Sequence, residues 1–158
     1  MYHSAMNDPG GKDEAGTADV AKGRDPGELM FWLIHGARAL ESRMEDALAA
    51  VGTSLAKHGV LTLLVEAGEP LALSELAARQ SCVRSNMTQL VDRLEADGYV
   101  ERTPDPNDRR SVRASLTPLG RDRQAAGAGE IDRVKVAFTA TLSGPDLAAL
   151  ERVVSVLD

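Results

Sequence analysis

The sequence predicts a mostly α-helical protein with one small β-hairpin. Apolar residues recur every three or four positions over most of residues 28–157, and only residues 99–103 and 112–117 read as strands. With 158 residues, 43% of them hydrophobic, we expect one domain (28–158) with a substantial core. Residues 1–27 show no apolar period, so we expect a disordered or loosely attached tail.

Two helices are predicted first. One covers about residues 28–51 and is followed by Gly52, a common residue after a helix end. The other covers about residues 55–66 and is closed by Gly68 and Pro70. The apolar repeat of the first helix consists of Leu33, Ala37, Leu40, Met44, Leu48 and Val51.

A short helix and a polar-faced helix come next. Ser74 is a good N-cap for a helix over 74–79. The following helix, about 84–97, ends at Gly98 and has one narrow apolar stripe, so its opposite face is polar. Two such helices joined by a tight turn are typical of a helix-turn-helix. The stripe is Met87, Leu90, Val91 and Leu94, and the polar side carries Ser85, Gln89 and Asp92, with Thr88 and Arg93 beside them.

A hairpin and two more helices complete the chain. The strands 99–103 and 112–117 flank turn-forming residues, which makes the unit a winged helix-turn-helix. Thr117 caps a helix that runs to about Leu142, and Pro118 takes its favoured first position. Several glycines weaken this helix and predict an irregularity near 127–129. Ser143 caps the last helix, and the turn residues of the hairpin are Pro104, Pro106, Asn107 and Asp108.

Charge is distributed unevenly along the chain. The formal net charge is −6, yet residues 81–123 carry eight basic and seven acidic side chains. Because charges more than about 8 Å apart are largely screened at physiological salt, a local cationic patch can still bind a polyanion. The major groove of DNA accepts one helix and presents distinct donors and acceptors. Ser85, Thr88 and Gln89 suit base edges, and Arg93 suits a phosphate or a guanine.

Two segments resemble the MarR family of transcription regulators. They are "LVDRLEADGYVER" at 90–102 and "DPNDRRSVRASLTPLG" at 105–120, within a winged region over 75–120. Their order and spacing are similar to the recognition helix, first wing strand and wing tip of that family. The resemblance extends in layout over about 28–157.

The resemblance implies a homodimeric repressor that binds a pseudo-palindromic operator in double-stranded DNA and is released by a small aromatic or phenolic ligand or by oxidation. Helices over 28–51 and 118–158 would dimerise, and 55–117 would bind DNA. Arg110 matches the wing-tip arginine, and Asp108 the acidic residue that orients it. The family often has Ser or Thr where this chain has Val83, so Ser81 would cap instead or the helix would start later. The DNA-binding prediction comprises Arg84, Ser85, Asn86, Thr88, Gln89, Arg93, Asp108, Arg109, Arg110 and Arg113.

Other interpretations remain beside these. The wing arginines Arg109, Arg110 and Arg113 also fit a solvated face. Cys82 is either a small buried hydrophobe or a redox sensor. The residues Trp32, His35 and Arg38 share a helix face and serve packing or, with His58, an effector pocket.

Several classes of protein are disfavoured. Scattered histidines and the lack of HExxH or CxxC argue against a metal site, and no motif of catalysis or cofactor binding is present. No apolar run approaches the about 20 residues of a membrane span, and one cysteine with no secretory signal fits the cytoplasm. The alternative function is a dimeric small-molecule-binding or protein-interaction module that keeps the fold and has lost DNA binding.

Overall fold

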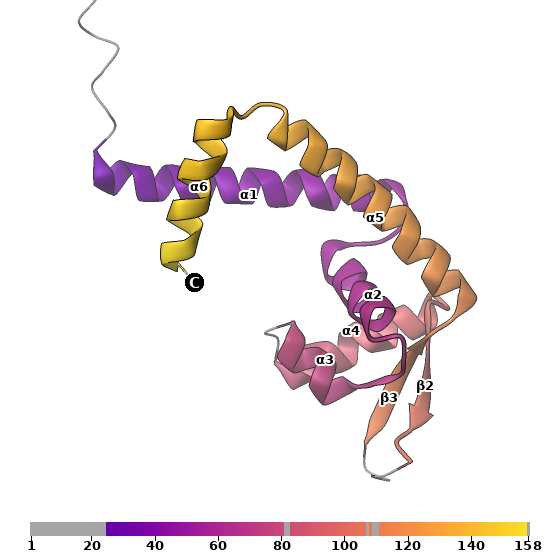
Figure 1. Cartoon of the computed structure of the whole chain (residues 1–158). Coiled ribbons are helices and arrows are strands. Elements are labelled where there is room, and N and C mark those ends of the chain that lie inside the picture. Colours follow the sequence, from indigo (N-terminus) through magenta and orange to yellow (C-terminus); the bar gives the residue numbers. More distant parts are fainter. Residues whose placement is uncertain (1–24, 81–82, 107, 109–110, 158) are drawn as a thin grey trace, which may run out of the picture. The chain divides into compact units, whose positions relative to one another are not determined.

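The computed structural model describes residues 25–80, 83–106, 108 and 111–157. Over these residues the chain is mostly helical with a small antiparallel sheet, which confirms the predicted fold class (Figure 1). In chain order the elements are α1 (Pro26–Ala50), α2 (Leu55–Ala67), β1 (Leu71–Ala72), α3 (Leu73–Arg79), α4 (Arg84–Ala96), β2 (Val100–Pro104), β3 (Val112–Leu116), α5 (Pro118–Thr139) and α6 (Gly144–Leu157).

The chain divides into two compact units, one ending at Ala37 and one beginning at Arg38. In the first unit α1 begins at Pro26, because the Gly27 amide donates to the Asp25 carboxylate at 2.9 Å and caps the helix. A run of apolar side chains on this helix is 39% to 69% exposed. The run consists of Leu29, Met30, Phe31, Trp32, Leu33 and Ile34.

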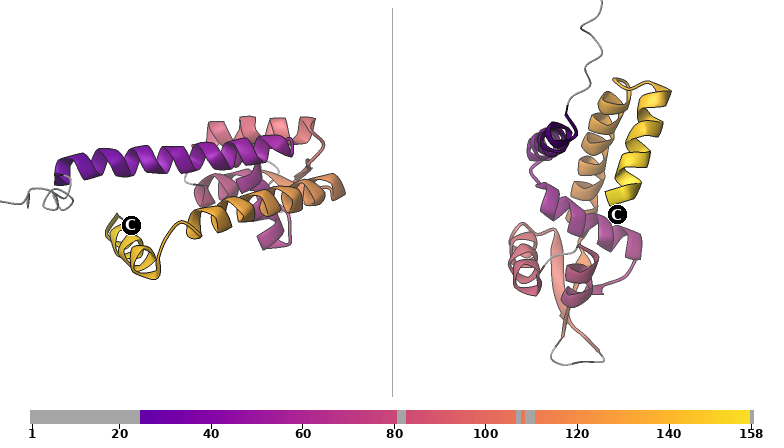
Figure 2. Two further views of the ribbon diagram at one scale, coloured as in Figure 1. Left: turned by 90° about the horizontal axis from the view of Figure 1, so that it is seen from above. Right: turned by 90° about the vertical axis from the view of Figure 1, so that its left-hand side faces the viewer.

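The second unit is built around one apolar core. Helices α2, α3 and α4 pack together against the sheet, and α5 runs beside α2 in both views of Figure 2. The sheet order is β1-β3-β2, with both pairs antiparallel. The apolar faces of α2, α3 and α4 are directed toward this core. The buried core residues are Val60, Leu61, Leu64, Leu71, Leu76, Ala77, Met87, Val91, Leu94, Tyr99, Val100 and Ala114.

One prediction about α3 was wrong, and the strand that precedes it was not predicted. Ser74 is not the N-cap, because α3 begins at Leu73 and Ala72 takes the cap position without a side-chain hydrogen bond. The reason is β1, which the sequence did not reveal: Leu71 pairs with Ala114 of β3, and the chain passes directly from strand to helix. A strand of two residues is too short to show an alternating pattern.

Other helix ends agree with the sequence. The Thr117 hydroxyl accepts a hydrogen bond from the Gly120 amide at 3.0 Å, and Pro118 opens α5. Ser143 and Asp146 exchange hydrogen bonds at the start of α6: the Ser143 amide donates to the carboxylate at 2.9 Å, and the Asp146 amide donates to the Ser143 hydroxyl at 3.4 Å. Side-chain capping therefore sets where both C-terminal helices begin.

The predicted irregularity in α5 is absent, because the helix is continuous from Pro118 to Thr139. Two of its glycines serve close packing instead. A Cβ on Gly127 would lie 2.5 Å from Nδ1 of His58, and a Cβ on Gly120 would collide with the Tyr99 carbonyl oxygen. Their helix-propensity cost is offset by the close approach of neighbouring elements.

Within the described residues, no single helix is long and apolar enough to cross a bilayer. One bent pair, Gly27–Ala50 with Leu55–Ala67, meets the requirement by length and composition only.

The glycines of α5 make a matched test. Gly120→Ala should lower the free energy of unfolding by about 1–3 kcal/mol, because the new methyl group meets backbone that cannot move aside. Gly129→Ala, in the same helix with nothing within 4 Å of the new Cβ, should raise it by about 1 kcal/mol. Urea denaturation measures both, and equal effects of the two substitutions would contradict the packing role of Gly120.

Candidate nucleic-acid interface

The orientation of α4 is set by its apolar stripe. Met87, Val91 and Leu94 are fully buried, so the other sides of the helix are directed away from the core. Val83 occupies the cap position without a side-chain hydrogen bond, and α4 begins at Arg84, so the alternative of a later helix start is wrong. Ser81, the alternative cap, lies outside the described residues. The predicted contact residues of α4 that are exposed are Ser85, Asn86, Thr88, Gln89 and Arg93.

Four of these residues share one surface, which we call the outer face of α4: Ser85, Asn86, Gln89 and Arg93. Asn86, Gln89 and Arg93 also line an open groove of about 340 Å³, together with residues of α2 and the end of α3. The structure thus brings three predicted contact residues to one place. A strip of amide and guanidinium groups beside a shallow groove provides donors and acceptors for a polar partner. The remaining lining residues are Ala56, Gln80 and Leu90.

Asp92 was predicted on the polar face, and the structure turns it toward the hairpin. Its carboxylate pairs with Arg102 of β2 at 2.5 Å, and Glu95 lies 3.6 Å from the same guanidinium. Arg102 also donates to the Thr88 carbonyl oxygen at 3.2 Å. Sequence reasoning missed Arg102, although alternation in β2 places it on the same side as the buried Val100, where a charged group needs partners.

The wing is held by a second arginine. Arg113 Nε lies 2.7 Å from the carboxylate of Asp105, which is only 8% exposed, and Nη1 donates to the Pro70 carbonyl at 3.1 Å. The hydrogen bond and charge of Asp105 raise the pKa of Arg113 above its ordinary value. The predicted DNA contact of Arg113 stays a prediction, and two of its nitrogens face the protein.

The tip of the wing is only partly described. Asp108 is exposed, and its carbonyl oxygen accepts from the Ser111 amide at 2.8 Å. The Asp105 amide donates to the Ser111 carbonyl at 3.0 Å, so the two strands close on a short loop. Arg109 and Arg110 lie outside the described residues, as does Cys82, and their predicted roles stay predictions. The predicted contact of the Arg84 side chain likewise stays a prediction.

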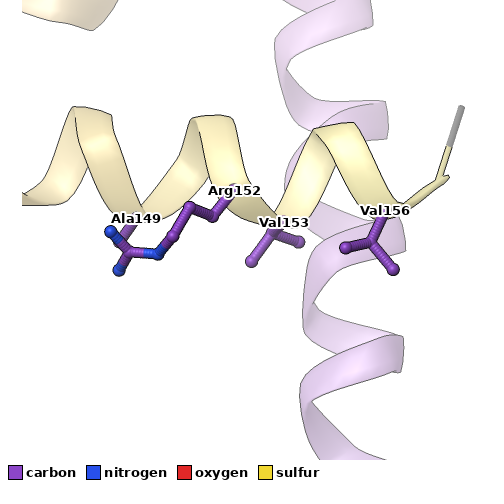
Figure 3. Close-up of a pocket in the computed structure, with 4 residues that line it drawn as sticks. All are labelled: Ala149, Arg152, Val153 and Val156. Carbon is purple, nitrogen blue, oxygen red and sulfur yellow. The ribbon is translucent and has the colours of Figure 1, made fainter.

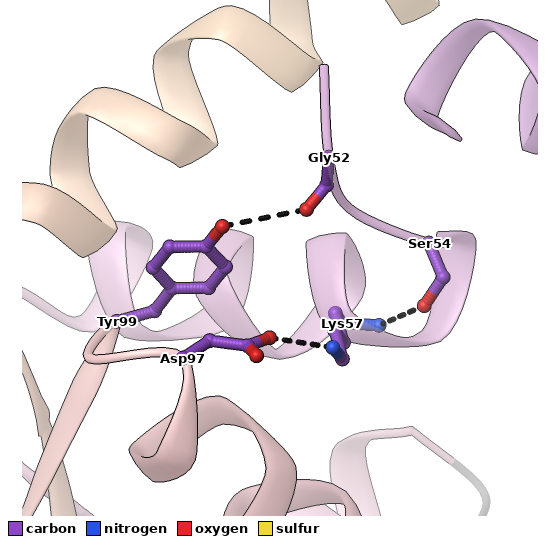
Figure 4. A network of polar contacts seen from close by, with 5 residues as sticks. All are labelled: Gly52, Ser54, Lys57, Asp97 and Tyr99. Atoms are coloured by element: carbon purple, nitrogen blue, oxygen red, sulfur yellow. Dashed lines mark hydrogen bonds and ion pairs between the residues drawn. The ribbon is translucent and has the colours of Figure 1, made fainter. Parts of the chain in front are cut away.

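A polar network joins the start of α2 and the turn after α1 to the residues that follow α4 (Figure 4). The Tyr99 hydroxyl donates to the Gly52 carbonyl at 3.3 Å, and Lys57 of α2 pairs with Asp97 after α4 at 2.5 Å. The Arg123 guanidinium of α5 lies 5.3 Å from the centroid of the Tyr99 ring, a cation–π distance. A shift of α5 would therefore change the contacts at the start of α2 and at the end of α4.

The predicted effector residues are divided between the two units. Trp32 and His35 of the first unit form an edge-to-face ring pair with centroids 6.0 Å apart. Arg38 and His58 belong to the second unit. His58 is half-buried against α5, and its Nδ1 is buried without a hydrogen-bond partner among the described residues. Burial, and next the charge of Lys135, lower the pKa of His58 below its ordinary 6.5.

The arrangement defines the class of protein: a winged helix-turn-helix protein with an exposed polar face on its second helix. Comparisons with known proteins agree. Residues 54–112 match the model of the MarR family. Over these residues the winged helix of this chain is similar to that of the MarR family.

Curated relatives match in the same region. The transcriptional regulator PrsX of Escherichia coli is 34% identical over 93 residues, 58% of this chain and 56% of that protein. The transcriptional repressor YetL of Bacillus subtilis (strain 168) is 33% identical over 97 residues, 61% of this chain and 58% of that protein. The chain thus spans a little over half the length of each of these relatives.

Solved structures share the fold over most of the chain. A mutant of MarR from Escherichia coli, crystallised with operator DNA, superposes with a TM-score of 0.72 at 24% identity and covers 85% of this chain and 99% of that one. A MarR-like protein from Bacillus cereus gives 0.73 at 23% identity, over 81% and 91%. At these identities the likeness establishes the fold alone.

The environment of His58 generates a pH prediction. Because the pKa of His58 is lower in the folded chain than in the unfolded chain, the unfolded chain binds the proton first as the pH falls below about 6.5. The free energy of unfolding should therefore fall in that range, and it should fall less in His58→Asn, which takes up no proton there. Urea denaturation at about pH 7.5 and about pH 5.5 tests this; identical losses in both proteins would contradict it.

Proposed function

We propose that the chain is a cytoplasmic, DNA-binding transcriptional regulator that acts as a homodimer. The observation that carries the proposal is the outer face of α4, which is polar, exposed and held on a helix whose opposite stripe is fully buried. A helix of this kind fits the major groove, where base edges present a readable pattern. The family match and the names of the relatives support the same reading.

In this proposal α4 reads bases and the hairpin reaches the backbone. Gln89 and Asn86 offer amides that pair with base edges, and Arg93 offers a guanidinium for a guanine or a phosphate. Ser85 and Thr88 supply further polar groups, and Arg84, Arg109 and Arg110 add positive charge for phosphates and the narrow minor groove, with Asp108 orienting Arg110. Arg113 supports the wing through Asp105. Affinity should fall steeply with salt, because phosphate contacts release counterions.

The proposed homodimer would bury the exposed apolar surfaces of both ends of the chain. In the first unit these are the side chains of the run from Leu29 to Ile34. On α6, Ala149, Arg152, Val153 and Val156 lie along one side of the helix (Figure 3), and Val156 is 85% exposed. Twofold pairing would present two α4 helices to half-sites about 10 bp apart, one turn of DNA.

Regulation is proposed to act by changing the distance between the two α4 helices of the dimer. The regulator is a repressor in this proposal, as YetL is named, and a small aromatic or phenolic ligand near Trp32, His35, Arg38 or His58 would release it. The network around Tyr99 can transmit such a change, because it connects α5 to the start of α2 and to the end of α4. Oxidation of Cys82, which precedes α4 by two positions in the sequence, is the other input.

A second candidate function is a dimeric ligand-binding or protein-interaction module without DNA binding. The net charge of −6 and the missing side-chain cap at Val83 favour it. Selection of bound duplexes from a random pool, followed by mobility shifts at low and moderate salt, separates the two. Enrichment of a pseudo-palindrome supports the regulator, and no enrichment with an intact dimer supports the module.

The outer face and the wing make a DNA prediction. Gln89→Ala and Arg110→Ala should each weaken binding to the selected duplex by about 1–3 kcal/mol and leave the dimer intact. Gln89→Ala should also relax the preference at one base pair, whereas Arg110→Ala should act at the flanks. Arg133→Ala, an exposed arginine of α5, is the control and should change little. Fluorescence anisotropy measures all three, and an unchanged affinity of both variants would argue against the interface.

The apolar surfaces make a prediction about assembly. Phe31→Asp and Val156→Asp should each raise the dimer dissociation constant by about 30-fold, or ~2 kcal/mol, because a buried charge replaces an apolar contact. Glu66→Ala on α2 is the control. Light scattering over a dilution series gives the mass, and a dimer that persists in both variants would exclude these surfaces from the interface.

A further inference from the structure

We propose that Arg102 is a positioning residue, which locks the rotation of α4 relative to the wing so that both meet one half-site together. The inference rests on the proposed function and adds a residue that touches no base. It is carried by the contacts between one side chain of β2 and three residues of α4.

The position of Arg102 in β2 directs it at α4. In this strand Val100 is buried, Glu101 is exposed and Arg102 is half-buried with 24% of its side chain exposed, so Arg102 lies on the side of the core. Its Cα partner across the sheet is Ala114, which is fully buried. A guanidinium at this edge of the core is stable only with anionic or carbonyl partners.

The contacts of Arg102 described above all come from one stripe of α4. Nη2 pairs with Asp92 at 2.5 Å and donates to the Thr88 carbonyl at 3.2 Å, and Nε lies 3.6 Å from Glu95. Residues 88, 92 and 95 are spaced i, i+4 and i+7, so they follow one side of the helix for about 10 Å. The buried stripe limits the rotation of α4 to a narrow range, and contacts with Arg102 spread over two turns oppose the small rotations that remain.

A rotation of α4 would affect DNA recognition, because the outer face of α4 lies beside the stripe of residues that contact Arg102. Gln89 directly follows Thr88, and Arg93 directly follows Asp92, so a turn of α4 that separates Asp92 from Arg102 also moves both outer-face residues. Recognition of base edges tolerates errors of only about 0.5 Å. Non-specific attraction to phosphates has no such requirement. Loss of the contact should therefore reduce selectivity more than overall affinity.

Asp92 acts either only as a negative charge near DNA or as the partner that holds Arg102, and the two roles predict opposite changes in affinity when Asp92 is removed. Asp92 is 53% exposed on a helix proposed to face DNA, so by charge alone its removal should strengthen binding to any duplex. If Asp92 serves to hold Arg102, its removal should weaken binding to the selected duplex while binding to a scrambled duplex stays equal or improves.

The experiment compares dissociation constants of the full chain for the selected duplex and for a scrambled duplex of equal length. Arg102→Met and Asp92→Ala should each reduce the ratio of the two constants by about tenfold. Arg102→Lys should restore part of the ratio, because it keeps the charge but cannot span both carboxylates. Arg133→Met removes an arginine that pairs with Glu130 of the same helix, and it should change the ratio by less than about twofold.

Thermal unfolding establishes that each variant is folded. If Arg102→Met is unfolded, the result of Asp92→Ala alone tests the positioning role. This variant retains Arg102, which keeps Glu95 as a partner. An unchanged ratio in the folded variants, or tighter binding of both duplexes by Asp92→Ala in equal measure, would overturn the positioning role alone. A wild-type chain that selects no duplex would overturn the proposed function, and this inference with it.

Discussion

Burial of three side chains on one stripe of α4 is the constraint on which the rest depends. Met87, Val91 and Leu94 are fully buried among residues of α2, α3 and the sheet. Removing such side chains from water contributes roughly 1.5–3 kcal/mol each, far more than any surface contact in this unit. The rotation of α4 is thereby set within narrow limits, and Ser85, Asn86, Gln89 and Arg93 are left outside.

Polar contacts refine what the core sets. Arg102 connects α4 to β2, Arg113 connects the wing to the residue before β1, and Lys57 connects α2 to the end of α4. The first contact joins two consecutive elements, and the other two join elements about 40 residues apart in the sequence. A wing and a helix fixed to each other in this way can present one continuous surface, which the proposed reading of a half-site requires.

The same geometry explains why α5 tolerates its glycines. Gly120 and Gly127 let Tyr99 and His58 approach the helix closely, and Arg123 then covers the Tyr99 ring. The junction is therefore tightly packed, and burial there lowers the pKa of His58 below its ordinary value. A change in the position of α5 has a direct route to the helix-turn-helix through these contacts.

The sequence by itself determined the order and type of the elements, the buried stripe of α4 and the polar residues opposite it. These features follow from local periodicity, caps and turn residues, which neighbouring positions encode. Only the tertiary structure decided the short strand at Leu71, the uncapped start of α3 at Leu73, the continuity of α5 and the partners of Arg102 and Arg113. The pairing of Leu71 with Ala114 joins residues distant in the chain, and the partners of Arg102 and Arg113 depend on how neighbouring elements fold back on one another. The pattern of a single segment carries no record of either.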